Sequence, residues 1–215
     1  MHQLIRPITS PTCLTRYRHG TNQWTEVTPA EKTEIWEQLG IMQQGRCAYC
    51  ECALPIQNDH YAAHIEHFRQ RGRYPQGTFE WENLFGSCNR QNSCGKHKDE
   101  CGAYHHTVLI KPDIEDPEYF FLFVADGSIA VRQGLSATEQ HRAAETLRIL
   151  NLDAQHGALR QMRFNAVQGY IQTAEELAAL SADFPEKEWL DLLQQELAAV
   201  EHLPFVSAIK HILKG

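Results

Sequence analysis

The spacing of apolar residues separates a helical C-terminal part of the chain from a mixed N-terminal part. After residue 136, apolar side chains recur every three or four positions, as in helices that bury one face. Ser136 and Glu139 form a capping box that predicts the start of a helix. Further helices are expected over about 154–179, after Pro185 and after Pro204. We therefore expect residues 136–215 to form a helical bundle.

The N-terminal part contains signals for both helix and strand. Thr28, followed by Pro29 and Glu31, predicts a helix that ends near Gly45. Two apolar runs flank Asp126-Gly127, which predicts a β-hairpin within the connecting segment 111–135. The run from Thr107 to Ile110 is a strand candidate. Residues 1–27, rich in polar and turn-forming residues, are interpreted as an extended arm rather than a packed element.

The segment between Cys47 and Cys101 has little helical periodicity and contains six of the seven cysteines. The start of the chain lacks an apolar leader, and the longest apolar run, 120–125, is too short to cross a membrane. We therefore expect a cytoplasmic protein without membrane contact. In that compartment thiols stay reduced, so clustered cysteines favour a metal site over disulfides.

Two cysteine groups have the order of a structural Zn²⁺ site. Cys47 and Cys50 form a CxxC pair, whose short gap lets both thiolates reach one tetrahedral ion, and Cys88 and Cys94 supply the other two ligands. The gap between Cys88 and Cys94 is wide, so Cys52 and Cys101 remain alternatives for the fourth ligand. Free structural thiols are another alternative. A redox pair at Cys47 and Cys50 would need a thioredoxin-like βαβ context, which the sequence lacks.

The net charge of -7, from 20 basic and 27 acidic residues, excludes a generally basic nucleic-acid coat. The excess of acidic residues lies in residues 111–215, because the preceding residues contain equal numbers of acidic and basic side chains. Six basic residues between Phe68 and Lys98 are expected to contact nucleic-acid phosphates: Arg69, Arg71, Arg73, Arg90, Lys96 and Lys98. The aromatic residues among them either stack on bases or fill a small core.

A histidine-rich motif lies between the cysteine pairs, in the sequence AHIEHF. Glu66 beside His67 suits phosphodiester hydrolysis, because a carboxylate can hold a divalent metal while a neutral imidazole takes a proton from water. Strand neighbours point to opposite faces, so this pair requires a kink or a site around the end of a strand. His64 shares the face of Glu66 and is a candidate metal ligand, supporting group or substrate contact. The alternatives are Asp59-His60 as the acid–histidine pair and an ordinary ion pair on a strand.

The order of these motifs resembles the HNH endonucleases. The segments CAYCE, IEHF, NLFGSC and LIKPDIEDPEYFF are similar to the HNH proteins of retron and Septu-type anti-phage systems, often called PtuB, over roughly residues 28–130. The resemblance implies an α+β fold with a zinc-stapled ββα-metal (HNH) core over 28–110. The hairpin segment would connect this core to the helical C-terminal region.

The resemblance also implies roles for individual residues. His67 matches the general base, Glu66 an acidic ligand of a catalytic Mg²⁺ or Mn²⁺, and Asn83 the residue that orients the base and fixes the loop. The family's remaining ligand follows the second cysteine group, where this sequence has Gly95, so His97 is the expected substitute. The next candidates are Asn89 and Asn92.

We therefore expect an endonuclease that cuts DNA or RNA, including tRNA, as the toxic effector of an anti-phage complex. The implied partner is a PtuA-type ATPase, with a retron reverse transcriptase and its RNA-linked DNA as a further partner. The acidic region 136–215 suits a protein partner better than nucleic acid. The departure at Gly95 leaves open an alternative, a catalytically degenerate zinc-stapled adaptor.

Overall fold

The structure, a computed structural model, describes residues 1–57, 60–183 and 185–215. Asp59, the acid of the alternative acid–histidine pair, lies outside the described residues. The chain combines seven α-helices with three small two-stranded sheets in its described part. This is the mixed α+β architecture that the sequence predicted.

Helix α1 (Pro29–Gln43) confirms the first predicted helix. The Thr28 hydroxyl accepts a hydrogen bond from the Glu31 amide while the Glu31 carboxylate accepts from the Thr28 amide, and Gln44 ends the helix in a left-handed conformation (φ 52°). Its buried face packs on the second strand of the largest sheet. The two elements approach closely at Gly86, where a Cβ atom would lie only 2.6 Å from the ring of Trp36.

Three antiparallel hairpins supply the strands: β1 (Ile56–Gln57) with β2 (His60–Tyr61), β3 (Ala63–His67) with β4 (Leu84–Cys88), and β5 (Phe121–Phe123) with β6 (Ile129–Val131). The hairpin of β5 and β6 confirms the predicted turn at Asp126-Gly127. In the central hairpin, Ala63 pairs with Cys88 and His67 with Leu84. Helix α2 (Cys94–Glu100) follows and packs against β4. This hairpin and α2 position the candidate site.

Five helices complete the chain: α3 (Ala137–Leu150), α4 (Ala158–Gln168), α5 (Ile171–Asp183), α6 (Glu186–Ala199) and α7 (Val206–Lys214). The prediction of one helix over 154–179 is wrong, because the chain breaks at Gly169, which ends α4 and is a poor helix former. The predicted strand at Thr107 is also wrong. That segment forms a 3₁₀ turn, and the Ile110 amide donates to Thr146 of α3 instead of pairing with a strand.

The N-terminal arm is packed, contrary to our expectation. Met1, Leu4 and Leu14 are buried, and the Leu4 amide donates to the carbonyl of Pro112. Arg6 pairs with Asp113 and donates to the carbonyl of Trp81, so the arm joins two distant segments. An apolar residue at every few positions of a polar segment was sufficient to anchor it.

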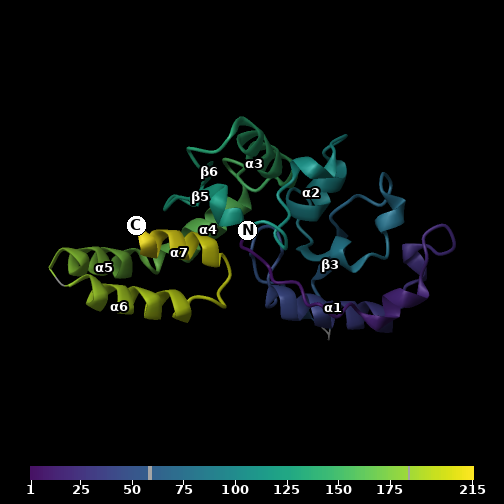
Figure 1. Cartoon of the computed structure of the whole chain (residues 1–215), viewed down its shortest axis with the longest axis horizontal. Helices are drawn as coiled ribbons and strands as arrows, with labels where there is room; N and C mark the ends of the chain where they lie inside the picture. The colour runs from purple at the N-terminus through teal and green to yellow at the C-terminus, as the bar shows by residue number, and fades with distance from the viewer. Residues whose placement is uncertain (58–59, 184) are drawn as a thin grey trace.

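The elements lie along one long axis (Figure 1). Helix α1 and β3 lie at one end, α5 and α6 project at the other, and α7 lies between them near the N-terminus. Arg46 links the two parts by donating to the carbonyls of Glu201 and Leu203, and the carboxylate of Glu51 accepts from the Ser207 amide of α7. Within the described segments, none of the helices combines the length and apolarity needed to cross a bilayer.

Candidate functional site

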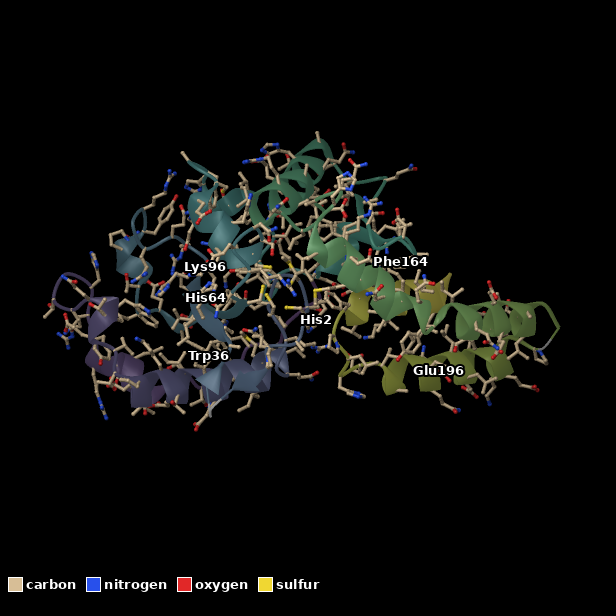
Figure 2. All side chains as sticks on the ribbon, turned by 180° about the vertical axis from the view of Figure 1, so that it is seen from behind. His2, Trp36, His64, Lys96, Phe164 and Glu196 are labelled. Carbon is tan, nitrogen blue, oxygen red and sulfur yellow. The ribbon has the colours of Figure 1, made fainter. Side chains whose placement is uncertain are left out.

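Four buried cysteines form a candidate metal centre. The Sγ atoms of Cys47, Cys50, Cys88 and Cys94 lie within 4.8 Å of one another, and those of Cys50 and Cys88 are 3.9 Å apart. Tetrahedral zinc with Zn–S bonds of about 2.3 Å separates its sulfur ligands by roughly 3.8 Å. Figure 2 shows sulfur atoms gathered near the centre of the molecule. The donor set and its spacing fit a structural ion such as zinc.

The shared hydrogen bonds of the cluster divide its cysteines: the pKa of Cys47 and of Cys88 is lowered, whereas the pKa of Cys50 and of Cys94 is raised. Burial alone would raise the pKa of Cys47, but hydrogen bonds with the neighbouring thiols lower this pKa well below its usual value. The Cys88 amide donates to Cys47 Sγ at 3.4 Å. Cys101, an alternative fourth ligand, donates to the Lys98 carbonyl and lies outside the cluster. Cys52 is buried beside the four, but the geometric cluster contains Cys94 in the fourth position.

A cavity of about 260 Å³ opens at the end of β3. It lies between β3 with the loop that follows it, helix α2 and the N-terminal arm, and its lining includes Trp24, His64, Glu66, His67, Arg71, Lys96 and Asp99. His67 is the last residue of β3, so the cavity wraps around the end of the strand. Glu66 and His67 therefore both border the same space although strand neighbours point to opposite faces.

Glu66 is buried and ionised. Its Oε1 atom lies 2.6 Å from Lys98 Nζ, and its Oε2 atom lies 3.3 Å from His64 Nε2. Burial raises the pKa of Glu66, but the ammonium of Lys98 and the imidazole of His64 outweigh burial, so the pKa is lowered. The carboxylate is thus held charged in an interior position, as a cation ligand would have to be.

His67 is held as a neutral base. Burial, reinforced by the charge of Arg71, lowers the pKa of His67 to about 4. Its Nε2 atom lies 3.0 Å from the carbonyl oxygen of Thr78, which can only accept, so Nε2 carries the proton. The ring of Trp24 packs against the imidazole edge to face. Nδ1 is therefore the basic atom, and the ring cannot turn without losing both contacts.

Asn83 stabilises the loop that joins β3 to β4. Its Oδ1 atom accepts from the Arg69 amide at 2.7 Å, and its Nδ2 atom donates to the carbonyls of Gly77 and Arg69. Gly77 precedes Thr78, whose carbonyl accepts a hydrogen bond from His67. Asn83 thereby positions His67 through the loop and does not line the cavity itself.

The cysteine motif has a glycine at position 95 because His64 and its neighbouring carboxylate leave no room for a side chain on Gly95. A Cβ atom on Gly95 would lie 2.5 Å from Glu66 Oε2 and 2.8 Å from His64 Nε2, so only glycine leaves room for these two side chains. His64 Nδ1 lies 2.9 Å from Asn89 Oδ1. With Nδ1 donating to this amide oxygen, Nε2 faces the Glu66 carboxylate; burial lowers the pKa of His64, but the hydrogen bond and charge of Glu66 outweigh burial and raise it, which favours a proton on Nε2. Two electron-rich atoms thus converge, which suits either a proton or a bound cation between them.

The placement of His97 differs from our expectation. His97 Nδ1 donates to the carbonyl of Ile149 in α3, and His97 is not among the residues that line the cavity. Positions two residues apart on a helix do not face the same side, so Gly95 and His97 point in different directions. His97 is therefore not brought to Glu66, and His64 occupies the place beside the carboxylate.

The six basic residues do not form one surface. Lys98 is fully buried between Glu66 and the carbonyl of His67, so the prediction that it contacts nucleic acid is wrong. Arg69 pairs with Glu80, and Arg73 donates to the carbonyl of Tyr104. Of the six, Arg71 and Lys96 line the cavity at the end of β3, and Figure 2 shows Lys96 next to His64. Arg90 lines a separate cavity. Burial of Lys98 had no signal in the sequence, and neither did the packing of Trp24 on His67.

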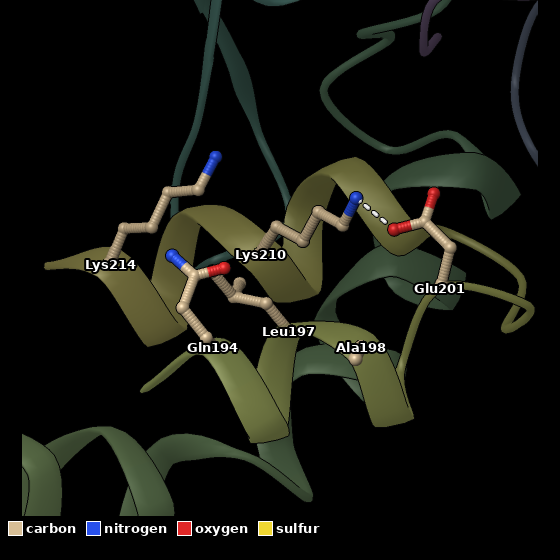
Figure 3. A pocket seen from close by; sticks show the side chains of 6 residues that line it. All are labelled: Gln194, Leu197, Ala198, Glu201, Lys210 and Lys214. Atoms are coloured by element: carbon tan, nitrogen blue, oxygen red, sulfur yellow. Dashed lines mark ion pairs between the residues drawn. The ribbon is translucent and has the colours of Figure 1, made fainter. Parts of the chain in front are cut away.

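A hollow of about 440 Å³ between α6 and α7 lacks comparable chemistry (Figure 3). Lys210 pairs with Glu201 there, and Lys214 pairs with Glu118. Its remaining lining residues are Gln194, Leu197 and Ala198. This lining contains neither a histidine nor a cysteine, so the cavity beside β3 is the better candidate active site.

One comparison with known proteins relates the chain to a defence protein. The chain is 31% identical over 101 residues to a protein of Bacillus thuringiensis named Septu protein PtuB. The aligned residues make up 46% of this chain and about a third (34%) of the relative. No protein-family model matches the sequence. The chain is thus similar to a Septu-type defence protein over nearly half of its length.

Proposed function

We propose that this protein is a metal-dependent HNH-type endonuclease that hydrolyses phosphodiester bonds. The observation that carries the proposal is the convergence of a neutral base, His67, and an ionised acid, Glu66, in a cavity next to the four-cysteine cluster. The strands β3 and β4 followed by α2 have the order of a ββα core, and the similarity to Septu protein PtuB agrees with it.

His67 is assigned the role of general base. A base with a pKa of about 4 is unprotonated at neutral pH, and its free Nδ1 atom can take a proton from an attacking water. Thr78 and Trp24 fix the ring, while Asn83 holds the loop that carries Thr78. This preorganisation keeps the basic atom at the cavity without competition from a second orientation.

Glu66 and His64 are assigned as ligands of a catalytic divalent cation, Mg²⁺ or Mn²⁺. The carboxylate oxygen is a ligand that Mg²⁺ and Mn²⁺ prefer, and an imidazole nitrogen lies 3.3 Å from it next to Gly95. When bound, the cation would stabilise the charge that develops on the departing oxygen. Arg71 and Lys96, at the same cavity, are suited to hold the phosphate.

In the cell, we assign the protein to a Septu-type anti-phage system, as its toxic effector. The similarity to Septu protein PtuB suggests a PtuA-type partner, for which the acidic C-terminal helices offer a surface. A retron reverse transcriptase with its RNA-linked DNA is an alternative partner. The nucleic acid cut, DNA or RNA, is left to experiment.

One observation favours a second candidate, a zinc-stapled adaptor without catalysis. Both carboxylate oxygens of Glu66 are engaged, one by Lys98 and the other by His64. In an adaptor, this buried network would only connect β3 to α2. Catalysis instead requires that a cation replace the proton between His64 and Glu66, while the pair with Lys98 persists.

Cleavage assays separate the two candidates. Purified protein, with and without its PtuA-type partner, is incubated with DNA and with total RNA in Mg²⁺ or Mn²⁺. We expect His67→Ala to reduce cleavage by about 100- to 10,000-fold, because the general base is lost. His105→Ala is the matched control, since this exposed histidine lies outside the cavity. Cutting that survives in His67→Ala, or no cutting by any preparation, would refute the nuclease assignment.

A further inference from the structure

A second cavity lies at the start of α4 and is separate from the candidate active site. Arg90, Asn92, Ser93 and Asn151 line it together with the first residues of α4. The space that the centre of a water-sized sphere can occupy in this cavity is about 10 Å³. That volume admits about one oxygen atom, so a larger group would insert one oxygen and remain outside with the rest.

The helix end at this cavity is suited to an anion. Gly157 caps α4 without a side chain, and the first turn of α4 contains no acidic residue. The first amides of a helix have no partner within the helix and carry a partial positive charge. A phosphate oxygen is the type of ligand that such an end binds.

Two side chains point independently to a ligand. Ser93 is only 2% exposed, and its hydroxyl finds no hydrogen-bond partner among the described residues, although serine at the start of α2 would ordinarily cap that helix. The Nε atom of Arg90 is likewise buried and unpartnered in the described part of the chain. Among the described residues, its Nη2 atom donates to the Met162 sulfur, a weak acceptor. Buried donors of this kind are normally satisfied.

Some of the residues that line the second cavity lie close in sequence to a residue that contacts the candidate active site. Asn89, which hydrogen-bonds His64, is followed at once by Arg90, Asn92 and Ser93. The four residue steps from Asn89 to Ser93 span at most about 14 Å, the axial length of about four nucleotides of one strand. A nucleic-acid strand at Glu66 and His67 can therefore reach the second cavity within a few nucleotides.

We propose that Arg90, Ser93 and the N-terminus of α4 form a binding site for one phosphate group of a nucleic-acid backbone. The site binds one phosphate oxygen in the cavity through the Ser93 hydroxyl, the Arg90 guanidinium and the free amides of α4. It fixes the direction of the strand relative to the cut. This inference deepens the proposed nuclease function, but binding does not require that the protein cut.

Phosphate binding is tested on the full, zinc-loaded chain. Inorganic phosphate is titrated at constant ionic strength while the amide signals of Ala158 and Leu159 are followed by NMR. We expect saturable shifts that weaken at least 10-fold in Arg90→Gln and also weaken in Ser93→Ala, which keeps the packing. Arg18→Gln, which removes the same charge from an exposed position of the N-terminal arm, should bind as the unmodified chain does. Absent shifts, or equal shifts in all variants, mean that the cavity holds only water and overturn the proposal.

Labelled DNA, single-stranded and duplex, then distinguishes a backbone phosphate from free phosphate. The slope of log Kobs against log salt should fall by about 0.7 to 0.9 in Arg90→Gln, the value of one lost phosphate contact. An unchanged slope would restrict the site to free phosphate and overturn the backbone assignment. Because both measurements concern binding, they can succeed when cleavage assays fail, and fail when cleavage succeeds.

Discussion

The half of the molecule around the cysteine cluster and the half formed by the C-terminal helices have different interiors. Around β3, β4 and α2, the buried residues include Glu66, His67, Asn83 and Lys98 as well as the four clustered cysteines. Helix α7, by contrast, buries mainly apolar side chains, among them Val206 and Ile209. The first half buries charge pairs and four cysteines that could hold a metal, whereas the second relies mainly on apolar packing, with the buried Arg163 paired to Asp153 as its charged exception.

The projecting helices sharpen this contrast. On α5 and α6, Leu177 and Leu193 are the buried apolar side chains among those described, and both helices pack chiefly on each other and on α7. Their other surface is rich in acidic residues: Glu175, Glu176, Glu186, Glu188, Asp191 and Glu196. Because α5 and α6 bury few side chains, substitutions on their outer surface should cost little stability. Loss of one buried polar group in the cysteine half should cost more.

Loss of the metal should produce the largest difference between the halves. Structural zinc contributes folding energy outright, so Cys47→Ser is expected to abolish binding of one Zn²⁺ per chain and to unfold the region of β3, β4 and α2. The helical circular dichroism of the C-terminal half should largely remain. Elemental analysis and circular dichroism measure the two effects.

Cys101→Ser is the matched control for this prediction, because Cys101 is partly exposed and outside the cluster. It should retain one Zn²⁺. Full zinc occupancy in Cys47→Ser, or equal loss in the control, would contradict the assigned ligand set.

The buried pair of Lys98 and Glu66 should give the next largest effect. Lys98→Met removes the only cation in direct contact with Glu66 Oε1 among the described residues, and leaves a buried carboxylate without its partner. Breaking such a pair costs about 3–5 kcal/mol of unfolding free energy. Urea unfolding at neutral pH measures this loss. Lys96→Met removes a half-buried neighbouring charge that lacks such a contact, and its cost should stay below about 1 kcal/mol. Equal losses would mean that the buried pair contributes nothing special.

Gly95→Ala should weaken both cleavage and stability. The new methyl group would lie 2.5 Å from Glu66 Oε2 and 2.8 Å from His64 Nε2, so the two proposed ligands must separate. We expect cleavage to fall about 10- to 100-fold, as when the support of a metal ligand is disturbed. Unfolding free energy should fall by about 1–3 kcal/mol.

Gly72→Ala provides the control, because no atom lies within 4 Å of its would-be Cβ. It should cleave as the unmodified protein does. If Gly95→Ala also retains full cleavage, the convergence of His64 and Glu66 is not part of the active site.

Features with a local cause were predictable from the sequence. The capping boxes at Thr28 and Ser136 mark the starts of α1 and α3, and both form as predicted. The CxxC spacing brings Cys47 and Cys50 into the cluster, and the Asp126-Gly127 turn directs its hairpin. In each case the residues that interact lie within a few positions, so the chain itself determines the geometry.

Features that depend on docking were not predictable. Lys98 was interpreted as a surface residue, because nothing in its neighbourhood shows that α2 will bury it against Glu66. The choice of His64 over His97 beside Glu66 depends on which face of α2 packs against β3. The arm was interpreted as unpacked because its composition is polar and turn-rich, and composition does not show that Arg6 pairs with Asp113, 107 residues away. Such contacts are tertiary and override local composition.

The smallest expected effect tests the apolar half through its one buried histidine, His211 of α7. Its Nδ1 atom accepts from the Phe123 amide of β5 at 2.9 Å, which requires a neutral ring. Burial lowers the pKa of His211, with a smaller contribution from the charge of Arg132, while Glu118 acts in the opposite direction. The unfolded chain therefore binds the proton more readily, so this contribution to stability is complete above about pH 6.5 and is lost as the pH falls toward the lowered pKa.

The loss should be about 1 kcal/mol, the value of one hydrogen bond. Urea unfolding between pH 7 and pH 5 measures it against His211→Asn, whose amide oxygen can replace the acceptor without titrating. The difference in unfolding free energy between the two proteins should shift toward the variant by about that amount as the pH falls. A difference that stays constant over this range would show that the junction of α7 and β5 does not depend on a neutral His211, and the C-terminal half would then be independent of pH where the cysteine half is not.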